Sequence, residues 1–282
     1  MSAGAPAGPG LGARLRQAVA AHGRLCAGID PHPSLLRDLG LGVDPAGLAT
    51  FAERCVAAFA GRVAVVKPQV SFFEAFGSRG IAVLEDTMAA LREAGALVLL
   101  DAKRGDIGST NAAYARAWFG EGAPLRCDAV TLSPYLGEDA LRGVVEAARA
   151  DGAGAFVLCR TSNPEAGRLQ GARRDDGLTV AAGVARWAEQ FEGDVGLVVG
   201  ITVRDALETL PLAGGRAPLL APGFGAQGGS AADLRGVFGD ESNRVLASVS
   251  RDLLRHAGSA ETLVQAVEGW QRELTAGEGP GR

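Results

Sequence analysis

The sequence is poor in the residues that build metal centres and reactive thiol sites. Only four cysteines and three histidines occur among its 282 residues. The cysteines are far apart and form no C-x-x-C pair, so we expect no zinc site. Three of the four lie in or beside apolar runs, which predicts buried, free thiols in a reducing cytoplasm. The scattered histidines suggest no histidine-based nucleophile system.

Long apolar segments and an excess of positive charge are also missing. No segment approaches the ~20 apolar residues that cross a bilayer, and the N-terminal MSAGAPAGPG lacks the basic start and apolar run of a secretory signal. The net charge of −4 disfavours general nucleic-acid binding, which needs clustered Lys and Arg. Hydrophobic residues still make up 47% of the chain, enough for a substantial core. We therefore expect a cytoplasmic protein that binds neither nucleic acid nor membrane.

Short apolar runs alternate with helical patterns along the chain. The predicted strands are nearly continuous in apolar residues, as in parallel strands covered on both faces; they span 25–30, 63–67, 96–101, 129–132, 154–159, 195–201, 218–221 and 244–249. Helical spacing falls between them, at 48–60, 81–94, 138–150, 179–191 and 261–273. This alternation predicts an α/β fold, a single-domain (β/α)₈ TIM barrel.

The barrel is expected to occupy residues 11–274. Residues 1–10 are predicted to be a disordered lead-in, and residues 275–282 a loose tail. The polar stretch 163–177, rich in glycine and arginine, is predicted to be a long loop on the barrel rim. Its composition favours a solvated loop, and a role in a closing lid stays open.

Barrel enzymes place their chemistry at the C-terminal ends of the strands. One predicted strand runs directly into a charged segment, LVLLDAKRGDIGST, which holds Asp101, Lys103 and Asp106. If the chain stays extended, Asp101 and Lys103 share one face, and two carboxylates around one ammonium would keep all three groups charged. From the spacing alone, a structural salt-bridge cluster and a catalytic cluster are equally good interpretations.

The segment DAKRGDIGST resembles the D-x-K-x-x-D-I-x-x-T signature of orotidine 5′-phosphate decarboxylases, in particular their longer, mycobacterial-type branch. Further motifs of that family follow in the expected order: AGIDP, VVKPQ, RTSNPEA, APGFGAQGG and NRVLASVSR. The resemblance implies decarboxylation of orotidine 5′-phosphate to UMP, the last step of de novo pyrimidine synthesis. It also implies that no cofactor or metal is used, and that the enzyme is a homodimer with shared active sites.

The resemblance also implies roles for individual residues. Lys103 matches the lysine that donates a proton to C6 of the pyrimidine. Asp101 matches the carboxylate beside the substrate carboxylate, and Lys67 matches a catalytic lysine of the charge network. Asp106 and Thr110 match residues that enter the neighbouring subunit's site. The other implied substrate contacts are Asp30 at the ribose, Ser162 at the pyrimidine, and Gln227, Gly228, Gly229, Ser250 and Arg251 at the 5′-phosphate.

The phosphate motif has a physical basis of its own. The Gln-Gly-Gly segment follows a predicted strand and leads towards a helix expected to start near Ser230. Glycines let backbone N–H groups approach an anion, and a helix start favours negative charge. Arg251, after the last strand, would supply further donors.

Two alternative functions are weighed against decarboxylation of orotidine 5′-phosphate. A sister barrel enzyme that decarboxylates a keto-gulonate phosphate through a magnesium-bound enediolate shares the D-x-K-x-x-D pattern. It needs an acidic ligand where this chain has Lys67. A catalytically inactive nucleotide-binding protein would retain Gln227 and Arg251 without the charged triad, which this chain keeps.

Overall fold

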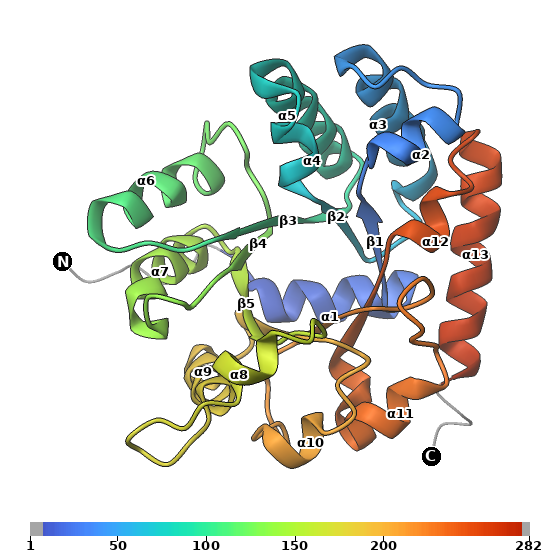
Figure 1. Cartoon of the computed structure of the whole chain (residues 1–282). Helices are drawn as coiled ribbons and strands as arrows, with labels where there is room; N and C mark the ends of the chain where they lie inside the picture. The colour runs from blue at the N-terminus through green and yellow to red at the C-terminus, as the bar shows by residue number, and fades with distance from the viewer. Residues whose placement is uncertain (1–7, 278–282) are drawn as a thin grey trace.

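The strands form a closed barrel. The computed structural model describes residues 8–277, and its eight parallel strands pair in sequential order, with the last closing on the first (Figure 1). They are β1 (Leu25–Ile29), β2 (Val65–Pro68), β3 (Leu97–Arg104), β4 (Ala129–Leu132), β5 (Gly154–Arg160), β6 (Val195–Val199), β7 (Leu219–Pro222) and β8 (Val245–Val249). Each predicted strand is present, and the predicted TIM barrel is confirmed.

Helices surround the barrel and cover its outer surface. The longer ones are α1 (Leu11–His22), α3 (Pro45–Phe59), α5 (Gly77–Glu93), α6 (Gly108–Trp118), α7 (Arg142–Ala150), α9 (Val180–Ala188) and α13 (Ala260–Ala276). Shorter ones are α2 (Pro33–Asp38), α4 (Val70–Glu74), η1 (Glu138–Leu141), α8 (Ala166–Gln170), η2 (Glu189–Phe191), α10 (Ala206–Thr209), α11 (Asp233–Phe238), η3 (Gly239–Arg244) and α12 (Arg251–Leu254). In residues 8–277 no helix combines the length and apolarity needed to cross a membrane.

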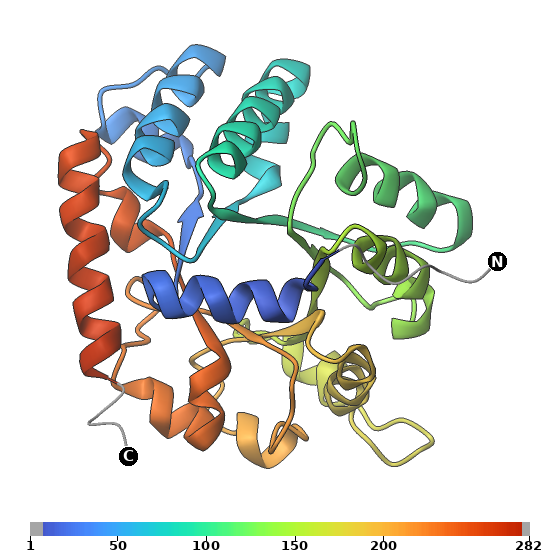
Figure 2. The same cartoon turned by 180° about the vertical axis from the view of Figure 1, so that it is seen from behind.

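The apolar core has two parts, one outside the strands and one inside the barrel. The inner part includes Cys26, Val65, Leu99 and Phe156, together with Leu15 of α1. Figure 2 shows α1 lying across one end of the barrel. Sequence reasoning did not predict this helix, whose buried apolar face is narrow. It closes the N-terminal end of the barrel and leaves the C-terminal strand ends as the open side.

Along each strand, residues that face into the barrel alternate with residues that face the helices. The last inward-facing residues of each strand therefore line the open end. On β3, Asp101 lies two residues beyond the inner residue Leu99. On β2, Lys67 lies two residues beyond the inner residue Val65. Both charged side chains are buried. A layer of polar groups therefore lies directly on top of the apolar interior.

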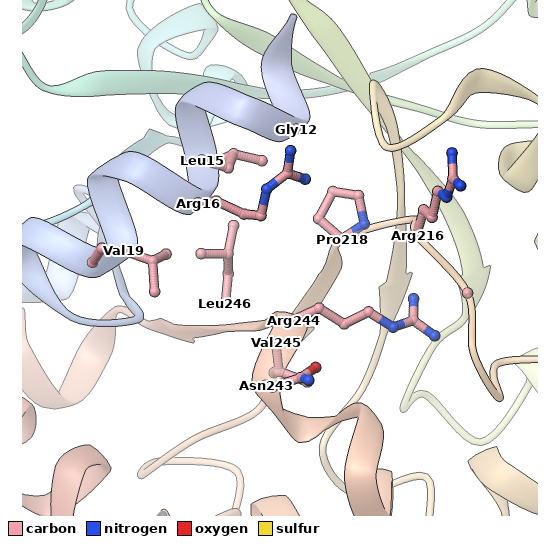
Figure 3. A pocket seen from close by; sticks show the side chains of 12 residues that line it. Gly12, Leu15, Arg16, Val19, Arg216, Pro218, Asn243, Arg244, Val245 and Leu246 are labelled. Atoms are coloured by element: carbon pink, nitrogen blue, oxygen red, sulfur yellow. The ribbon is translucent and has the colours of Figure 1, made fainter.

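A cavity of about 490 Å³ lies at the other end of the barrel, between α1 and the starts of β7 and β8 (Figure 3). Apolar side chains line it, together with Arg16, Arg216 and Arg244. The Arg244 guanidinium is already held by Glu241 and by backbone carbonyls. The closed end thus has a cavity and buried charges of its own, Arg24 before β1 and Asp128 before β4, whereas Lys67 and Asp101 are buried at the open end.

Several predicted boundaries differ from the structure. The stretch 163–177 contains the short helix α8, and the turn after it projects from the side of the barrel (Figure 1). There Arg174 pairs with Glu138. The helix expected near Ser230 begins at Asp233. Helix α13 runs through Ala276, into the predicted tail. Residues 1–7 and 278–282, the greater part of the predicted lead-in and tail, lie outside the described residues.

Candidate active site

A chain of three charged side chains crosses the open end of the barrel. The Nζ atom of Lys67 on β2 donates to Oδ2 of Asp101 at 2.7 Å. The Nζ atom of Lys103 donates to Oδ1 of the same carboxylate at 2.6 Å. Charge-assisted bonds of this length are strong and directional. Asp101 is therefore held between two ammonium groups, one on each oxygen.

The two lysines differ in their exposure to solvent. The side chains of Lys67 and Asp101 are each 7% exposed, whereas that of Lys103 is 43% exposed. A second acceptor, Oε1 of Gln69, lies 3.0 Å from Nζ of Lys103. Lys103 is thus the member of the chain that faces the open mouth, and it is held there from two sides.

Burial and neighbouring charges shift the pKa of each of the three groups. Burial opposes ionisation of Asp101, but Lys67 and Lys103 outweigh it and hold the pKa of this carboxyl well below its usual value. Burial also opposes the charge on Lys67, yet Asp101 and Asp30 raise its pKa above the usual lysine value. For Lys103, partial burial and repulsion by Lys67 outweigh the attraction of Asp101, so its pKa is lowered. Lys103 is the more readily deprotonated of the two lysines.

The backbone at Lys103 is strained. Its φ angle is 48°, in the left-handed region that residues other than glycine rarely occupy. Such a conformation costs roughly 1–3 kcal/mol and is kept only where the surroundings enforce it, often at functional sites. The predicted strand ends at residue 101, whereas β3 continues to Arg104 and is distorted at Lys103.

Two further polar atoms at the rim have no partner. Oδ1 of Asp30, after β1, and Oγ of Ser250, after β8, are buried and make no hydrogen bond within residues 8–277. Buried polar atoms are nearly always satisfied. Unsatisfied ones beside a charged cluster are suited to receive the polar groups of a ligand.

The Gln-Gly-Gly loop after β7 has a tightly determined shape. Gly228 has a φ angle of 88°, and a Cβ on Gly229 would lie 2.3 Å from the Ile201 side chain. The N–H groups of Gly228 and Gly229 donate to the carbonyls of Gly225 (2.8 Å) and Gly223 (3.0 Å) in the same loop. In this conformation the two glycines shape the loop, and their N–H groups are already used.

The start of α12 provides the positive charge near this loop. Gly225 of the loop packs against Asp252, one residue beyond Arg251. The side chains of Gln227 and Arg251 are exposed, and the Arg251 guanidinium makes no ion pair with any residue in 8–277. The ends of β7 and β8 thus carry an available cation and an amide, at the place where barrel enzymes commonly bind phosphate.

Ser162 lies at a different part of the rim. Together with Asn163 and Thr202 it lines a cavity of about 340 Å³ at the ends of β5 and β6, which Arg160 and Arg204 also border. The structure therefore brings Ser162 and Thr202 to one cavity, as expected for residues that follow neighbouring strands.

Asp106 and Thr110 do not bond to the cluster of Lys67, Asp101 and Lys103 within residues 8–277. The carboxylate of Asp106 accepts from the backbone of Ile107 at 2.8 Å, and its backbone is fixed by the Asn111 side chain. No ion pair links Asp106 to Lys103 within the described part of the chain. The expected pair of carboxylates around Lys103 is therefore not present in this structure, where Asp101 is the carboxylate that binds Lys103.

Two residues of the cluster had no role predicted from the sequence. Thr131 donates to Oδ1 of Asp101 at 2.8 Å, and Gln69 binds Lys103. Thr131 lies on β4 two residues beyond Ala129 of the inner core, and Gln69, one residue past the end of β2, lies two residues beyond Lys67. That alternation was the signal available in the sequence.

Thiol and metal chemistry find no support in the residues at this site. The four cysteines are buried and free, as predicted, and burial raises the pKa of Cys26, the thiol nearest the cluster, to about 12. A thiol with that pKa is not a nucleophile at neutral pH. Within residues 8–277 no three His, Cys, Asp or Glu side chains converge as metal ligands.

Comparison with known proteins agrees with the geometry. The family model described as orotidine 5′-phosphate decarboxylase / HUMPS family matches residues 23–266. An orotidine 5′-phosphate decarboxylase of Salinispora tropica is 55% identical over 250 residues, covering 86% of this chain and 89% of that protein. One from Streptomyces coelicolor is 51% identical over 270 residues, covering 94% and 96%.

The likeness extends to three dimensions. A crystal structure from Streptomyces avermitilis superposes with a TM-score of 0.92 at 49% identity, covering 98% of this chain and 99% of that one. The residues that the family model matches include the charged side chains on β2 and β3 as well as the loops after β7 and β8. The chain therefore belongs to the orotidine 5′-phosphate decarboxylase / HUMPS family.

Proposed function

We propose that the protein converts orotidine 5′-phosphate to UMP and carbon dioxide, with Lys103 as the catalytic acid. The observation that carries this proposal is the ammonium of Lys103, held at the open end of the barrel between Asp101 and Gln69. Loss of carbon dioxide leaves an electron pair on C6 of the ring. A preorganised cation is the protein's main means of stabilising such a charge.

The reaction needs one bond cleavage and one proton transfer. The bond between C6 and the carboxylate carbon breaks, its electron pair stays on C6, and carbon dioxide departs. The Lys103 ammonium then gives a proton to C6 and becomes a neutral amine, which regains its proton from water. The lowered pKa of Lys103 makes this transfer easier than it would be for a lysine in solution.

Asp101 serves two purposes in this proposal. It orients Lys103 through the 2.6 Å contact, and it stays ionised because both lysines hold its pKa low. The substrate carboxylate, bound close to a fixed negative charge, would lose that repulsion when it leaves as neutral carbon dioxide. Lys67 keeps the network neutral enough to remain buried.

The substrate is held at points distant from C6. Arg251, with Ser250 and the loop of Gln227, would bind the 5′-phosphate at the ends of β7 and β8. The unsatisfied oxygen of Asp30 would accept from a ribose hydroxyl. Ser162 would contact the pyrimidine edge. Binding energy from these remote contacts can be used to fix the ring against Lys103.

We also propose that the protein works as a homodimer whose subunits share their sites. Within residues 8–277 neither Asp106 nor Thr110 bonds to the charged cluster, and large apolar side chains that follow β3 and β4 are exposed: Ile107 at 61%, Tyr135 at 76% and Leu136 at 53%. These residues follow β3 and β4, where a partner subunit would bring its Asp106 to the other site. Exposed apolar patches of this kind mark interaction surfaces.

UMP formation from orotidine 5′-phosphate in the presence of a metal chelator tests the proposed reaction. Full activity under chelation is the expected result. Activity restored only by magnesium would favour the enediolate chemistry of the sister enzymes, although Lys67 and Asp101 bind each other where that chemistry needs metal ligands. Tight nucleotide binding without any UMP would favour an inactive binding protein. The buried free thiols fit a reducing compartment, and the cytoplasm stays the predicted location.

A further inference from the structure

Thr131 on β4 is a buried polar residue whose hydroxyl connects two parts of the cluster. The residue is 1% exposed. Its Oγ1 donates to Oδ1 of Asp101 at 2.8 Å and accepts from the backbone N–H of Lys103 at 2.9 Å. Because the amide of Lys103 can only donate, the hydroxyl proton is directed to Asp101. One hydroxyl thus fixes the backbone of the lysine and the carboxylate that holds its side chain.

Thr131 sits where the pairing between β3 and β4 is irregular. Leu100 pairs with Val130, and the next pair joins Arg104 to Leu132. Between these pairs β4 contributes Thr131 alone, whereas β3 contributes the segment from Asp101 to Lys103. Bulges of this kind re-aim side chains beside active sites.

The bulge leaves backbone groups of β3 without a regular strand partner. Lys103, at a φ angle of 48°, is the strained member of the bulge. Its N–H bonds the Thr131 hydroxyl where a regular ladder would supply a backbone carbonyl. The side chain of Thr131 therefore holds the left-handed turn that directs Lys103 to the open mouth.

We infer that Thr131 is a positioning residue of the decarboxylation, which orients the Asp101–Lys103 pair through its hydroxyl without touching the substrate. This inference rests on the proposed function. The carboxylate of Asp101 receives a donor from each of the two lysines and a third from Thr131, so its plane is fixed before substrate binds. Fixing these groups in advance makes the electrostatic stabilisation of the carbanion effective.

Volume alone does not account for a threonine at this position. Valine has nearly the same shape and would fill the same space in the barrel interior. It would, however, leave the N–H of Lys103 without an acceptor and Asp101 with one donor fewer. Small displacements of a catalytic group can lower a rate about 100-fold.

The test compares Thr131→Val with Thr131→Ser and with a matched control, Thr87→Val. Thr87 on α5 is also buried, at 4% exposed, and its hydroxyl bonds the Val83 carbonyl on the outer side of the barrel. For each variant kcat, KM, the melting temperature and the affinities for UMP and 6-hydroxy-UMP are measured. The ionised 6-oxygen of the second ligand places a negative charge where the carbanion forms.

Thr131→Val is expected to lower kcat about 10- to 100-fold, the size of effect that a lost hydrogen bond to a charged group produces. It should lower the affinity for 6-hydroxy-UMP by a similar factor. KM and the affinity for UMP should change less than about threefold. Thr131→Ser restores the hydroxyl and should recover most of kcat. Thr87→Val should have a lower melting temperature than the wild type and an unchanged kcat.

Wild-type kcat in Thr131→Val, or no recovery in Thr131→Ser, would overturn the positioning role. Equal loss of affinity for both ligands would do the same, since it would indicate general disruption of the site. Lys103→Ala is assayed in parallel. Turnover by Lys103→Ala would refute the proposed function of Lys103. An inactive Lys103→Ala together with a fully active Thr131→Val would refute only the role of Thr131.

Discussion

Replacing each of the two lysines in turn by methionine separates the structural from the catalytic part of the charged chain. Both bind the same carboxylate at almost the same distance, 2.7 Å for Lys67 and 2.6 Å for Lys103. Their side chains differ in exposure, 7% against 43%. Methionine has a similar length and no charge. The two variants therefore differ mainly in which ammonium group still binds Asp101.

The expected costs to stability are very different. Breaking a buried pair leaves an uncompensated charge, which costs about 3–5 kcal/mol. A half-exposed pair contributes less than about 1 kcal/mol, because water screens it. At about 2–4 °C per kcal/mol for a protein of this size class, Lys67→Met should lower the melting temperature by roughly 6–20 °C. Lys103→Met should lower it by less than about 4 °C.

The pH dependence of unfolding provides the second signature. In the wild type, the lowered pKa of Asp101 contributes stability that is present above the unfolded-state pKa of about 3.9 and is lost as pH falls towards the folded-state pKa. Without Lys67 the pKa of Asp101 rises. The stability gap between Lys67→Met and wild type should therefore be widest near neutral pH and narrow as Asp101 is protonated.

The assay is thermal and urea unfolding followed by circular dichroism, at several pH values and at one ionic strength. Equal losses in the two variants, or a larger loss in Lys103→Met, would refute the reasoning, because burial would then not decide the contribution of each ion pair. A stability gap that widened with acidity would contradict the assigned charge state of Asp101.

Four further outcomes are expected. Lys103→Ala should lower kcat at least about 10³-fold, since it removes both the cation and the proton donor, while calorimetry should find UMP affinity changed less than about threefold. Arg251→Ala should raise KM for orotidine 5′-phosphate about 10- to 100-fold, and an equal loss of affinity for the nucleoside would contradict its assignment to the phosphate. In a pH series, kcat/KM should fall as pH rises through the pKa of Lys103, at lower pH than the ~10.4 of a free lysine; a decline only above that value would exclude Lys103 as the acid. Mixing inactive Asp106→Ala with inactive Lys103→Ala should restore about a quarter of wild-type activity, because half of the dimers are mixed and each has one intact site; no recovery after exchange of subunits would argue against shared sites.

The barrel could be predicted because its signal is repeated along the whole chain. Nearly continuous apolar strands alternate with helical spacing, and their C-terminal residues, such as Lys67 and Asp101, gather at one rim by geometry alone. Helix α1 escaped prediction since its inner contact rests mainly on Leu11 and Leu15. Such a narrow apolar face is hard to distinguish from an ordinary surface segment.

The finer arrangement of the site depends on contacts between strands, which spacing along one strand does not encode. The bulge between β3 and β4 places Thr131 opposite the segment from Asp101 to Lys103. Likewise, Asn111 fixes the turn that carries Asp106, and no ion pair joins Asp106 to Lys103 within residues 8–277. A prediction from the sequence alone grouped the three charged residues of the motif, whereas pairing across strands decides which of them meet.

Exchange of the C6 hydrogen of UMP for deuterium in heavy water tests the role of Lys103 most directly. In this exchange the neutral amine of Lys103 first removes the C6 proton, which reverses the proposed transfer, and the deuterated ammonium then gives a deuteron back to C6. Nuclear magnetic resonance of UMP incubated with the enzyme should show loss of the C6 proton signal far above the background rate. Lys103→Ala, saturated with UMP, should show none. Exchange at the wild-type rate in Lys103→Ala would contradict the assignment of Lys103 as the group that stabilises and protonates the C6 carbanion.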